Sequence, residues 1–205
     1  MLRAAKSLFV VAALLLVPTL ALPVRADTAE GASSFIRDLG AQAIAVLSDK
    51  QLGEQAREAA MRHIFLTGFD VDGIARFALG RYWRSASEAE QKQYLDLFKD
   101  YVVKVYTKAL SQAQNTRFVV KSARPSGTLH DVLVRSEVGE PDQDPSQVHW
   151  RVRETGRSFK VEDVVVEGVS MLLTKRHDFG AVLSQNDGKI DVLLERLQQE
   201  IDKIE

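Results

Sequence analysis

Apolar residues recur every three or four positions through the first half of the chain, which is the spacing of one helix face. Ser48 and Gln51 are placed to form a capping box for one helix, and Asp70 and Gly80 to begin and end the next. The pattern predicts helices over about residues 35–47, 51–65, 71–79 and 88–111.

The longest of these segments has the clearest signals. Ser85 and Ser87 each lie three residues before a glutamate, Glu88 and Glu90, so either pair fits a capping box at the helix start. Its apolar side chains fall within an arc of about 140°. They are Tyr94, Leu95, Phe98, Tyr101, Val102, Val105, Tyr106 and Ala109. This helix is therefore expected to bury one broad, aromatic-rich stripe.

After Asn115 the pattern changes to alternating apolar and polar residues, which is typical of half-buried strands. The turn at residues 154–157 predicts a hairpin between the two strands that flank it. Strands are expected over residues 117–124, 131–138, 148–153 and 159–169, and closing helices over residues 179–184 and 190–201. Clustered strands between helices predict an α+β fold, with helices packed on a twisted, mainly antiparallel sheet of about four strands.

The first 26 residues have the layout of a secretory signal peptide. Arg3 and Lys6 precede an uncharged apolar run, and small residues end the segment at Ala26. Cleavage between Ala26 and Asp27 would leave residues 27–205 as a single domain. The alternative is an uncleaved membrane anchor, because the uncharged stretch approaches the length of a membrane span.

Composition narrows the function classes. The chain has 205 residues, of which 45% are hydrophobic and 27% charged, with a formal net charge of −1 and no cysteine. A dedicated nucleic-acid-binding domain usually has a strong basic excess, so that class is disfavoured. The lack of cysteine excludes disulfides, thiol nucleophiles and thiolate metal sites.

No catalytic or metal-binding motif stands out, so we expect no catalytic residue, no metal ligand and no cofactor. Strict alternation would turn Asp163 and Glu167 toward an apolar region, as a general acid/base pair requires. Alternatively, a bulge near Val164 or Gly168 turns both carboxylates to solvent or to backbone amides. Asp178 is expected to cap the start of the helix that follows.

Aromatic residues concentrate between residues 69 and 106, and the predicted strands add many valines. Such a set is explained either by an ordinary core or by a sheet and helices that hold an apolar ligand between them. Periodicity does not distinguish a filled core from a lined cavity.

Several segments, in order, resemble the periplasmic phospholipid-carrier family named for toluene tolerance, the MlaC family. The resemblance covers about residues 30–200. The matching segments are Phe69-Asp70-Val71, Ile74 to Gly80, Tyr82-Trp83-Arg84, Phe159 to Val164, Glu167-Gly168-Val169-Ser170 and Arg176-His177-Asp178-Phe179. The segment Gly168-Val169-Ser170-Met171 is also similar to the corresponding segment of the hopanoid-associated HpnM branch.

The resemblance implies a non-catalytic periplasmic protein with a pocket between sheet and helices that holds acyl chains. It implies phospholipid as cargo, or a hopanoid in the specialised branch. It also implies two partners, an outer-membrane lipoprotein complex and an inner-membrane ABC transporter with its lipid-binding subunit. An enzyme that uses Asp163 or Glu167, and a non-catalytic adaptor with an ordinary core, are the competing interpretations.

We expect apolar residues of the helices and strands to line the lipid pocket. They are Phe69, Ile74, Phe77, Tyr82, Trp83, Phe98, Tyr101, Val102, Val105, Val132, Val134, Trp150, Val152, Val164, Val166 and Val169. Arg76, Arg81, Arg84 and Lys175 are candidates for a rim or docking surface, with ordinary solvated charges as the alternative.

Overall fold

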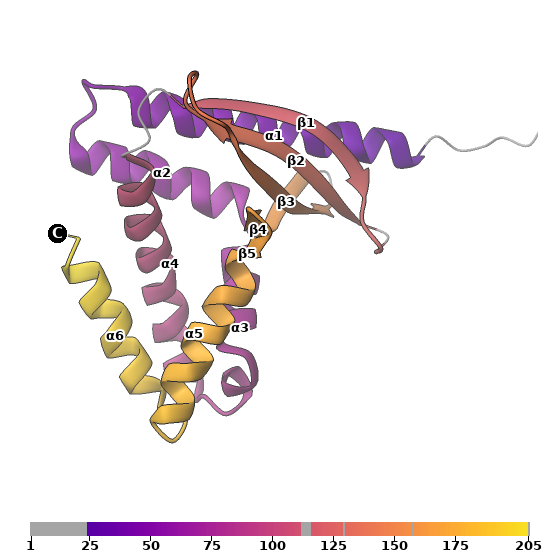
Figure 1. Ribbon diagram of the computed structural model, residues 1–205. Helices are drawn as coiled ribbons and strands as arrows, with labels where there is room; N and C mark the ends of the chain where they lie inside the picture. The colour runs from indigo at the N-terminus through magenta and orange to yellow at the C-terminus, as the bar shows by residue number, and fades with distance from the viewer. Residues whose placement is uncertain (1–23, 112–115, 129, 157, 205) are drawn as a thin grey trace, which may run out of the picture.

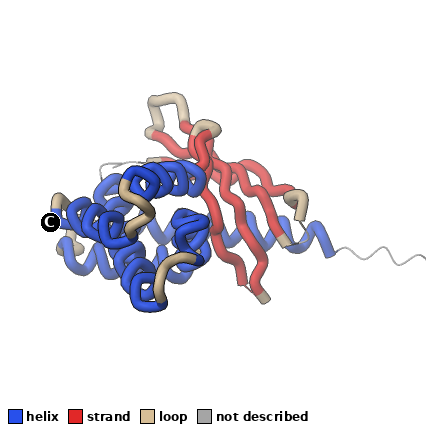
Figure 2. The backbone as a smooth tube through the Cα atoms, turned by 90° about the horizontal axis from the view of Figure 1, so that it is seen from below, coloured by secondary structure: helices blue, strands red, loops and turns tan. Residues whose placement is uncertain are grey.

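The computed structural model describes residues 24–111, 116–128, 130–156 and 158–204. A group of helices lies beside a curved antiparallel sheet, and one long helix runs along that sheet (Figure 1 and Figure 2). This arrangement confirms the predicted α+β fold. Most of the predicted signal peptide lies outside the described residues, so its cleavage stays a prediction.

Six α-helices and one short 3₁₀ helix form the helical part of the described residues. They are α1 (Val24–Ser48), α2 (Glu54–Gly68), α3 (Val71–Leu79), the 3₁₀ helix η1 (Gly80–Arg84), α4 (Glu88–Ser111), α5 (Met171–Gln185) and α6 (Ile190–Asp202). Helix α1 packs along β1 and β2, whereas α4 packs on α2, α3 and α6, and α5 packs on α3, α6 and β4.

Five strands pair as an antiparallel meander in which each strand lies beside the next one in sequence. They are β1 (Arg117–Pro125), β2 (Asp131–Gly139), β3 (Ser146–Thr155), β4 (Ser158–Val166) and β5 (Val169–Ser170). The predicted four strands correspond to β1–β4, and the fifth is a two-residue strand that folds back on the end of β4.

The predicted signals at the ends of α3 and α4 are present in the structure. Asp70 accepts a hydrogen bond from the Gly73 amide at 3.1 Å, and Gly80 has φ of 61° just after α3. At the start of α4, the Glu90 carboxylate accepts from the Ser87 amide at 2.8 Å and the Ser87 hydroxyl accepts from the Glu90 amide at 3.3 Å. The capping box therefore uses Ser87 and not Ser85.

Three predicted helix starts are wrong. Helix α1 begins at Val24 and not near residue 35. Helix α5 begins at Met171, because the Ser170 hydroxyl accepts from the Leu173 amide at 3.1 Å and caps it eight residues before Asp178, which lies inside the helix. Helix α2 is preceded by Gly53, which makes no side-chain cap, and Ser48 instead ends α1.

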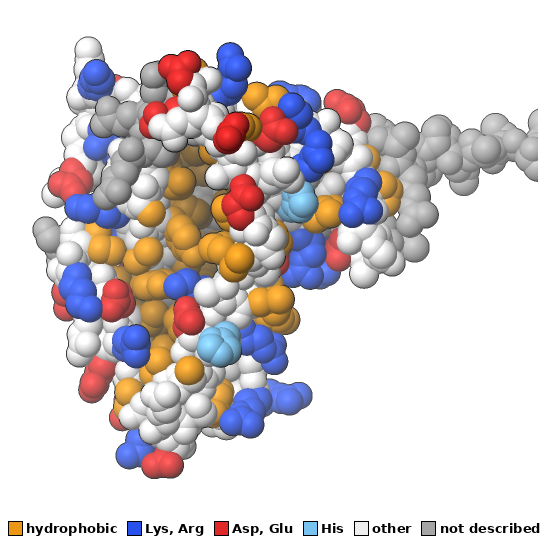
Figure 3. All heavy atoms as spheres, viewed as in Figure 1, with side chains coloured by type: hydrophobic (Ala, Val, Ile, Leu, Met, Phe, Trp, Pro, Cys, Tyr) orange, Lys and Arg blue, Asp and Glu red, His pale blue; other side chains and the backbone are white. Residues whose placement is uncertain are grey.

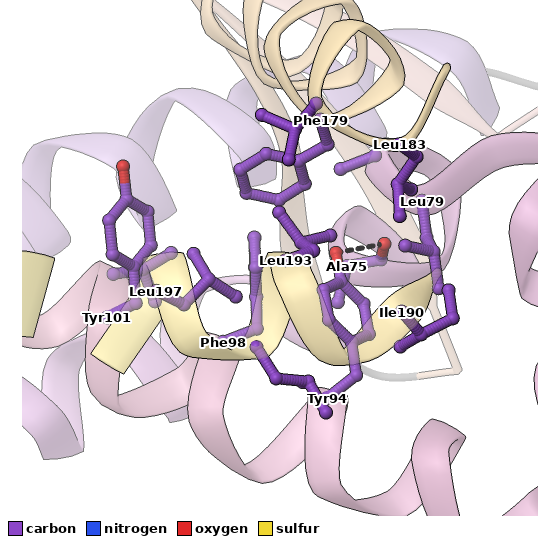
Figure 4. Close-up of a cluster of buried hydrophobic side chains, with 14 of the residues drawn as sticks. Ala75, Leu79, Tyr94, Phe98, Tyr101, Phe179, Leu183, Ile190, Leu193 and Leu197 are labelled. Atoms are coloured by element: carbon purple, nitrogen blue, oxygen red, sulfur yellow. Dashed lines mark hydrogen bonds between the residues drawn. The ribbon is translucent and has the colours of Figure 1, made fainter. Parts of the chain in front are cut away.

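Buried side chains fall into two clusters. The helical cluster joins α3, α4, α5 and α6, and its centre is a set of ring contacts among Tyr94, Phe98, Tyr101 and Phe179 (Figure 4). Tyr94 is fully buried, and its hydroxyl donates to the Ala75 carbonyl at 2.9 Å. Burial raises the pKa of Tyr94, so this hydroxyl stays a donor.

The sheet cluster joins α1 and α2 to one face of the sheet. Its most buried members are Ala32, Ile36, Met61, Val103, Val132, Val134, Val152 and Val161. A side chain at Gly40 would meet the Phe118 ring, since a Cβ there would lie 2.6 Å from it. The missing side chain lets α1 lie close against β1.

Candidate functional site

The face of the sheet that packs on α1 and α2 is buried to different degrees along β3 and β4. Val152 and Val161 have no exposed surface there. Trp150, Val164 and Val166 lie on the same face, by register and alternation, but are only half-buried. These three apolar side chains lie toward the turn between β2 and β3, where Ser136 and Val148 of the same face are buried.

Side chains from α4 and from the end of α2 connect the two buried clusters. Phe69 and Tyr106 each pack against both the helical and the sheet cluster. Phe65 connects them, with ring centres 5.3 Å from Phe69 and 6.3 Å from Tyr106. We define the apolar junction as the half-buried side chains between the two clusters. They are Phe69, Val105, Tyr106, Trp150 and Val164.

The surface between the sheet and the helices is hollowed and apolar. Figure 3 shows hydrophobic side chains gathered in a recess that runs from beneath the sheet down between α4 and α5, with basic and acidic side chains at its lower end. Helix α4 lies on one side of this recess and α5 on the other (Figure 1). An elongated apolar surface that is neither filled nor fully exposed suits a ligand with hydrocarbon chains.

One lysine crosses between the two helices at the recess. The Lys175 ammonium on α5 donates to the Tyr101 hydroxyl on α4 at 2.9 Å, and its side chain is 24% exposed. Its nearest carboxylate oxygen, on Asp178, lies 3.9 Å away. Burial alone would lower the pKa of Lys175, but the Tyr101 hydrogen bond and its charged neighbours raise it overall, so the ammonium stays protonated at neutral pH.

The structure distributes the predicted lipid-binding residues over both clusters. In the helical cluster are Ile74, Tyr82, Trp83, Phe98, Tyr101, Val102 and Val105. In the sheet cluster are Val132, Val134, Trp150, Val152 and Val164, while Phe69 belongs to both clusters and Val166 is half-buried on β4. Phe77 and Val169 lie at the surface, 39% and 54% exposed.

These residues therefore differ in what they can contact. Phe98 and Val152 are within 1% of full burial, so no ligand reaches them without a rearrangement of the core. Tyr82 lines a separate, open cleft beside Asp187 and Gly188, at the turn between α5 and α6. The apolar junction contains four of the predicted residues, Phe69, Val105, Trp150 and Val164, and in addition Tyr106, and all five are half-buried.

The two carboxylates that raised the question of acid/base chemistry have structural partners. A bulge at Glu162 changes the phase of β4, so that Val161 faces the sheet cluster and Asp163 the opposite side. Asp163 accepts from the Ser170 hydroxyl at 2.7 Å and the Leu172 amide at 3.1 Å. Glu167 accepts from the Gln147 amide at 2.5 Å. The bulge at Glu162 thus places Asp163 as the alternative with a bulge near Val164 expected, whereas Glu167 lies beyond β4, in the turn before β5.

A buried ionic group on the other face of the sheet escaped the sequence reasoning. Arg153 pairs with Asp131 at 2.9 Å and with Glu162 at 2.8 Å, and Arg151 lies 3.7 Å from Glu162. The Arg153 hydrogen bond lowers the pKa of Asp131, whereas burial raises the pKa of Glu162. Alternation along β3 places Arg151 and Arg153 on this face, but only the strand register shows which carboxylates meet them.

The described residues contain neither a cluster of metal-ligating side chains nor a helix suited to span a membrane. No group of three or more potential metal-ligating side chains comes together within residues 24–111, 116–128, 130–156 and 158–204. Across the same residues, no helix combines the length and the hydropathy that crossing a membrane requires.

The chain is similar to known proteins over most of its length. A family model described as MlaC protein matches residues 37–199. A phospholipid-binding protein from Ralstonia solanacearum, solved in complex with a phospholipid, shares the fold with a TM-score of 0.74 and 24% sequence identity. The similarity covers 84% of this chain and 98% of that one. The match to more than half of the chain confirms the predicted relationship, and this protein belongs to the MlaC family.

Proposed function

We propose that this protein is a periplasmic carrier that binds phospholipid and hides its acyl chains at the apolar junction. The observation that carries the proposal is the incomplete burial of apolar side chains on the inner face of β3 and β4. Trp150, Val164 and Val166 are half-buried there, although Val152 and Val161 of the same face have no exposed surface.

Physical chemistry supports a binding role at this place. Each methylene group that a lipid transfers from water to an apolar surface contributes about 0.8 kcal/mol. A carrier needs a dry surface long enough for acyl chains and no reactive group beside it. Asp163 and Glu167, the two carboxylates that best fitted catalysis by sequence, are engaged by backbone amides away from the junction.

The family and the solved relative support the choice of ligand. The Ralstonia protein of the same fold was solved with a phospholipid bound. We further propose that the carrier exchanges lipid with an outer-membrane lipoprotein complex and an inner-membrane ABC transporter. A hopanoid is the alternative cargo, which the resemblance of residues 168–171 to the HpnM branch favours.

Native mass spectrometry tests this function directly. The protein is purified from its own cells without detergent, and its mass is compared before and after extraction with organic solvent. An added mass that matches a phospholipid supports the proposal, and one that matches a hopanoid moves it to the specialised branch. A bare polypeptide mass that vesicles leave unchanged would overturn it in favour of an adaptor.

The same spectra test export. A chain that begins at Asp27 supports the predicted signal peptide, whereas an intact Met1 terminus on membrane-bound material supports the anchor. This readout is independent of the lipid result.

A further inference from the structure

Lys175 is a largely buried lysine that connects α5 to α4 and has few close partners. Its ammonium has three hydrogens to donate, and within the described residues Nζ has one hydrogen-bond acceptor, the neutral hydroxyl of Tyr101. Asp178, at 3.9 Å, is too far for a hydrogen bond. The Lys175 side chain is three-quarters buried, and two of its ammonium hydrogens are left for another acceptor.

Another lysine shows what full pairing looks like in this molecule. Lys99 is 29% exposed, close to the value for Lys175, but its Nζ lies 2.9 Å from the Asp72 carboxylate. A buried charge without a close counterion is costly, and proteins usually compensate it with an ion pair or a ligand. The Asp178 carboxylate compensates Lys175 only in part.

The position of Lys175 relates it to the proposed lipid site. Tyr101 lies on α4 one helical turn before Val105 and Tyr106, which belong to the apolar junction. Figure 4 shows the Tyr101 hydroxyl directed away from the rings of Phe98 and Phe179, out of the helical cluster. The charge of Lys175 also acts on Tyr106, whose pKa is raised chiefly by burial and lowered in part by this ammonium.

We infer that Lys175 binds the phosphate of the phospholipid headgroup while the acyl chains occupy the apolar junction. This inference rests on the proposed function and goes further, because it gives the carrier a means to prefer a phosphate-bearing lipid over a neutral one. A phosphate oxygen accepts strong, charge-assisted hydrogen bonds from an ammonium. A hopanoid or any other uncharged cargo would leave these donors unused.

The test compares two ligands with the same acyl chains, of which only one has a phosphate-bearing headgroup. Short-chain phosphatidylglycerol and diacylglycerol with identical acyl chains are titrated into the protein by calorimetry. Lys175→Met removes the ammonium and retains an apolar stem, whereas Lys175→Arg retains the charge. Lys92→Met is the matched control, since Lys92 also makes contact with an aspartate but is 81% exposed at the far end of α4.

For Lys175→Met, we expect phosphatidylglycerol binding to weaken roughly tenfold, which corresponds to about 1.4 kcal/mol, with diacylglycerol binding unchanged. Lys175→Arg and Lys92→Met should keep the preference of the unmodified protein. Retained diacylglycerol binding also shows that the variant is folded.

Equal weakening for both ligands, or no weakening for either, would overturn the role of Lys175 and leave the carrier function intact. If the unmodified protein binds neither ligand, the proposed function itself fails. The two failures are therefore distinguishable in one set of titrations.

Discussion

The helical cluster and the apolar junction are built from similar residues but are packed differently. Phe98 in the helical cluster is 1% exposed and meets the rings of Tyr94, Tyr101 and Phe179. Val105, two helical turns further along α4, is only half-buried. One continuous apolar stripe thus serves stability in its first half and faces the recess in its second half.

The difference follows from what lies opposite each half of α4. Phe98, in the first half, lies in the cluster that side chains of α3, α5 and α6 fill, whereas Tyr106, in the second half, packs between that cluster and the sheet cluster. Close packing maximises the dispersion attraction between side chains and the apolar area that they bury. Both quantities are smaller where two apolar surfaces leave a gap. A protein retains such a gap for a ligand, and the following predictions test this division.

Phe98→Ala should have the largest effect on stability. The substitution leaves a cavity in the helical cluster, and we expect the free energy of unfolding to fall by about 3–5 kcal/mol. Chemical denaturation measures the change, and native mass spectrometry measures lipid occupancy of the remaining folded protein. Lost occupancy in molecules that are still fully folded would contradict the division between the two regions.

Asp131→Asn should destabilise the sheet by about 1–3 kcal/mol at neutral pH, because Arg153 loses a charged partner at a position with 5% exposure. Equilibrium denaturation gives the value. Lipid occupancy should not change, since Asp131 lies on the face of the sheet opposite the junction. A selective loss of lipid would show that the ionic group shapes the site.

The same ionic group should make stability depend on pH in two opposite ways. The pKa of Asp131 is lowered in the folded protein, so its contribution is lost as pH falls below the ordinary value of 3.8. The pKa of Glu162 is raised, so acidification from neutral pH toward 4.5 favours the folded state. Thermal unfolding across this range should show the acid-side loss, which Asp131→Asn should flatten.

Val105→Asp should affect the site more than the fold. A carboxylate in the recess would lose its hydration when acyl chains bind beside it, so lipid binding becomes unfavourable. We expect lipid occupancy to fall at least tenfold while the free energy of unfolding falls by only about 1 kcal/mol. Val103→Ala is the control on the same helix, because Val103 is fully buried in the sheet cluster. That variant should lose stability and keep its lipid. The reverse pattern would place the lipid elsewhere.

Ser170→Ala should have the smallest effect, about 1 kcal/mol, because it removes the cap of α5. Ser87→Ala, which removes the cap of α4, should cost a similar amount. Thermal unfolding of both variants gives the comparison. A much larger loss for Ser170→Ala would show that its hydroxyl, which also donates to Asp163, ties α5 to β4.

Local patterns predicted a large part of the fold because helix and strand periods and caps depend on residues close in the chain. Helix α3, its cap at Asp70, the box at Ser87 and Glu90, and strands β1–β4 were all predicted. The start of α5 was not, because Ser170 and Asp178 are both suitable caps, and the pairing of Ser170 with Asp163 on β4 decided between them.

The sequence by itself therefore determined the order of helices and strands, the apolar stripe of α4 and the family. Only the tertiary structure decided which part of the stripe is core and which part faces the recess, where the bulge in β4 lies, and that Lys175 meets Tyr101. The physical reason is that these features depend on contacts between residues far apart in the chain. Tyr101 lies on α4 and Lys175 on α5, and all five strands come between these two helices in the sequence. No local pattern of residues therefore connects them.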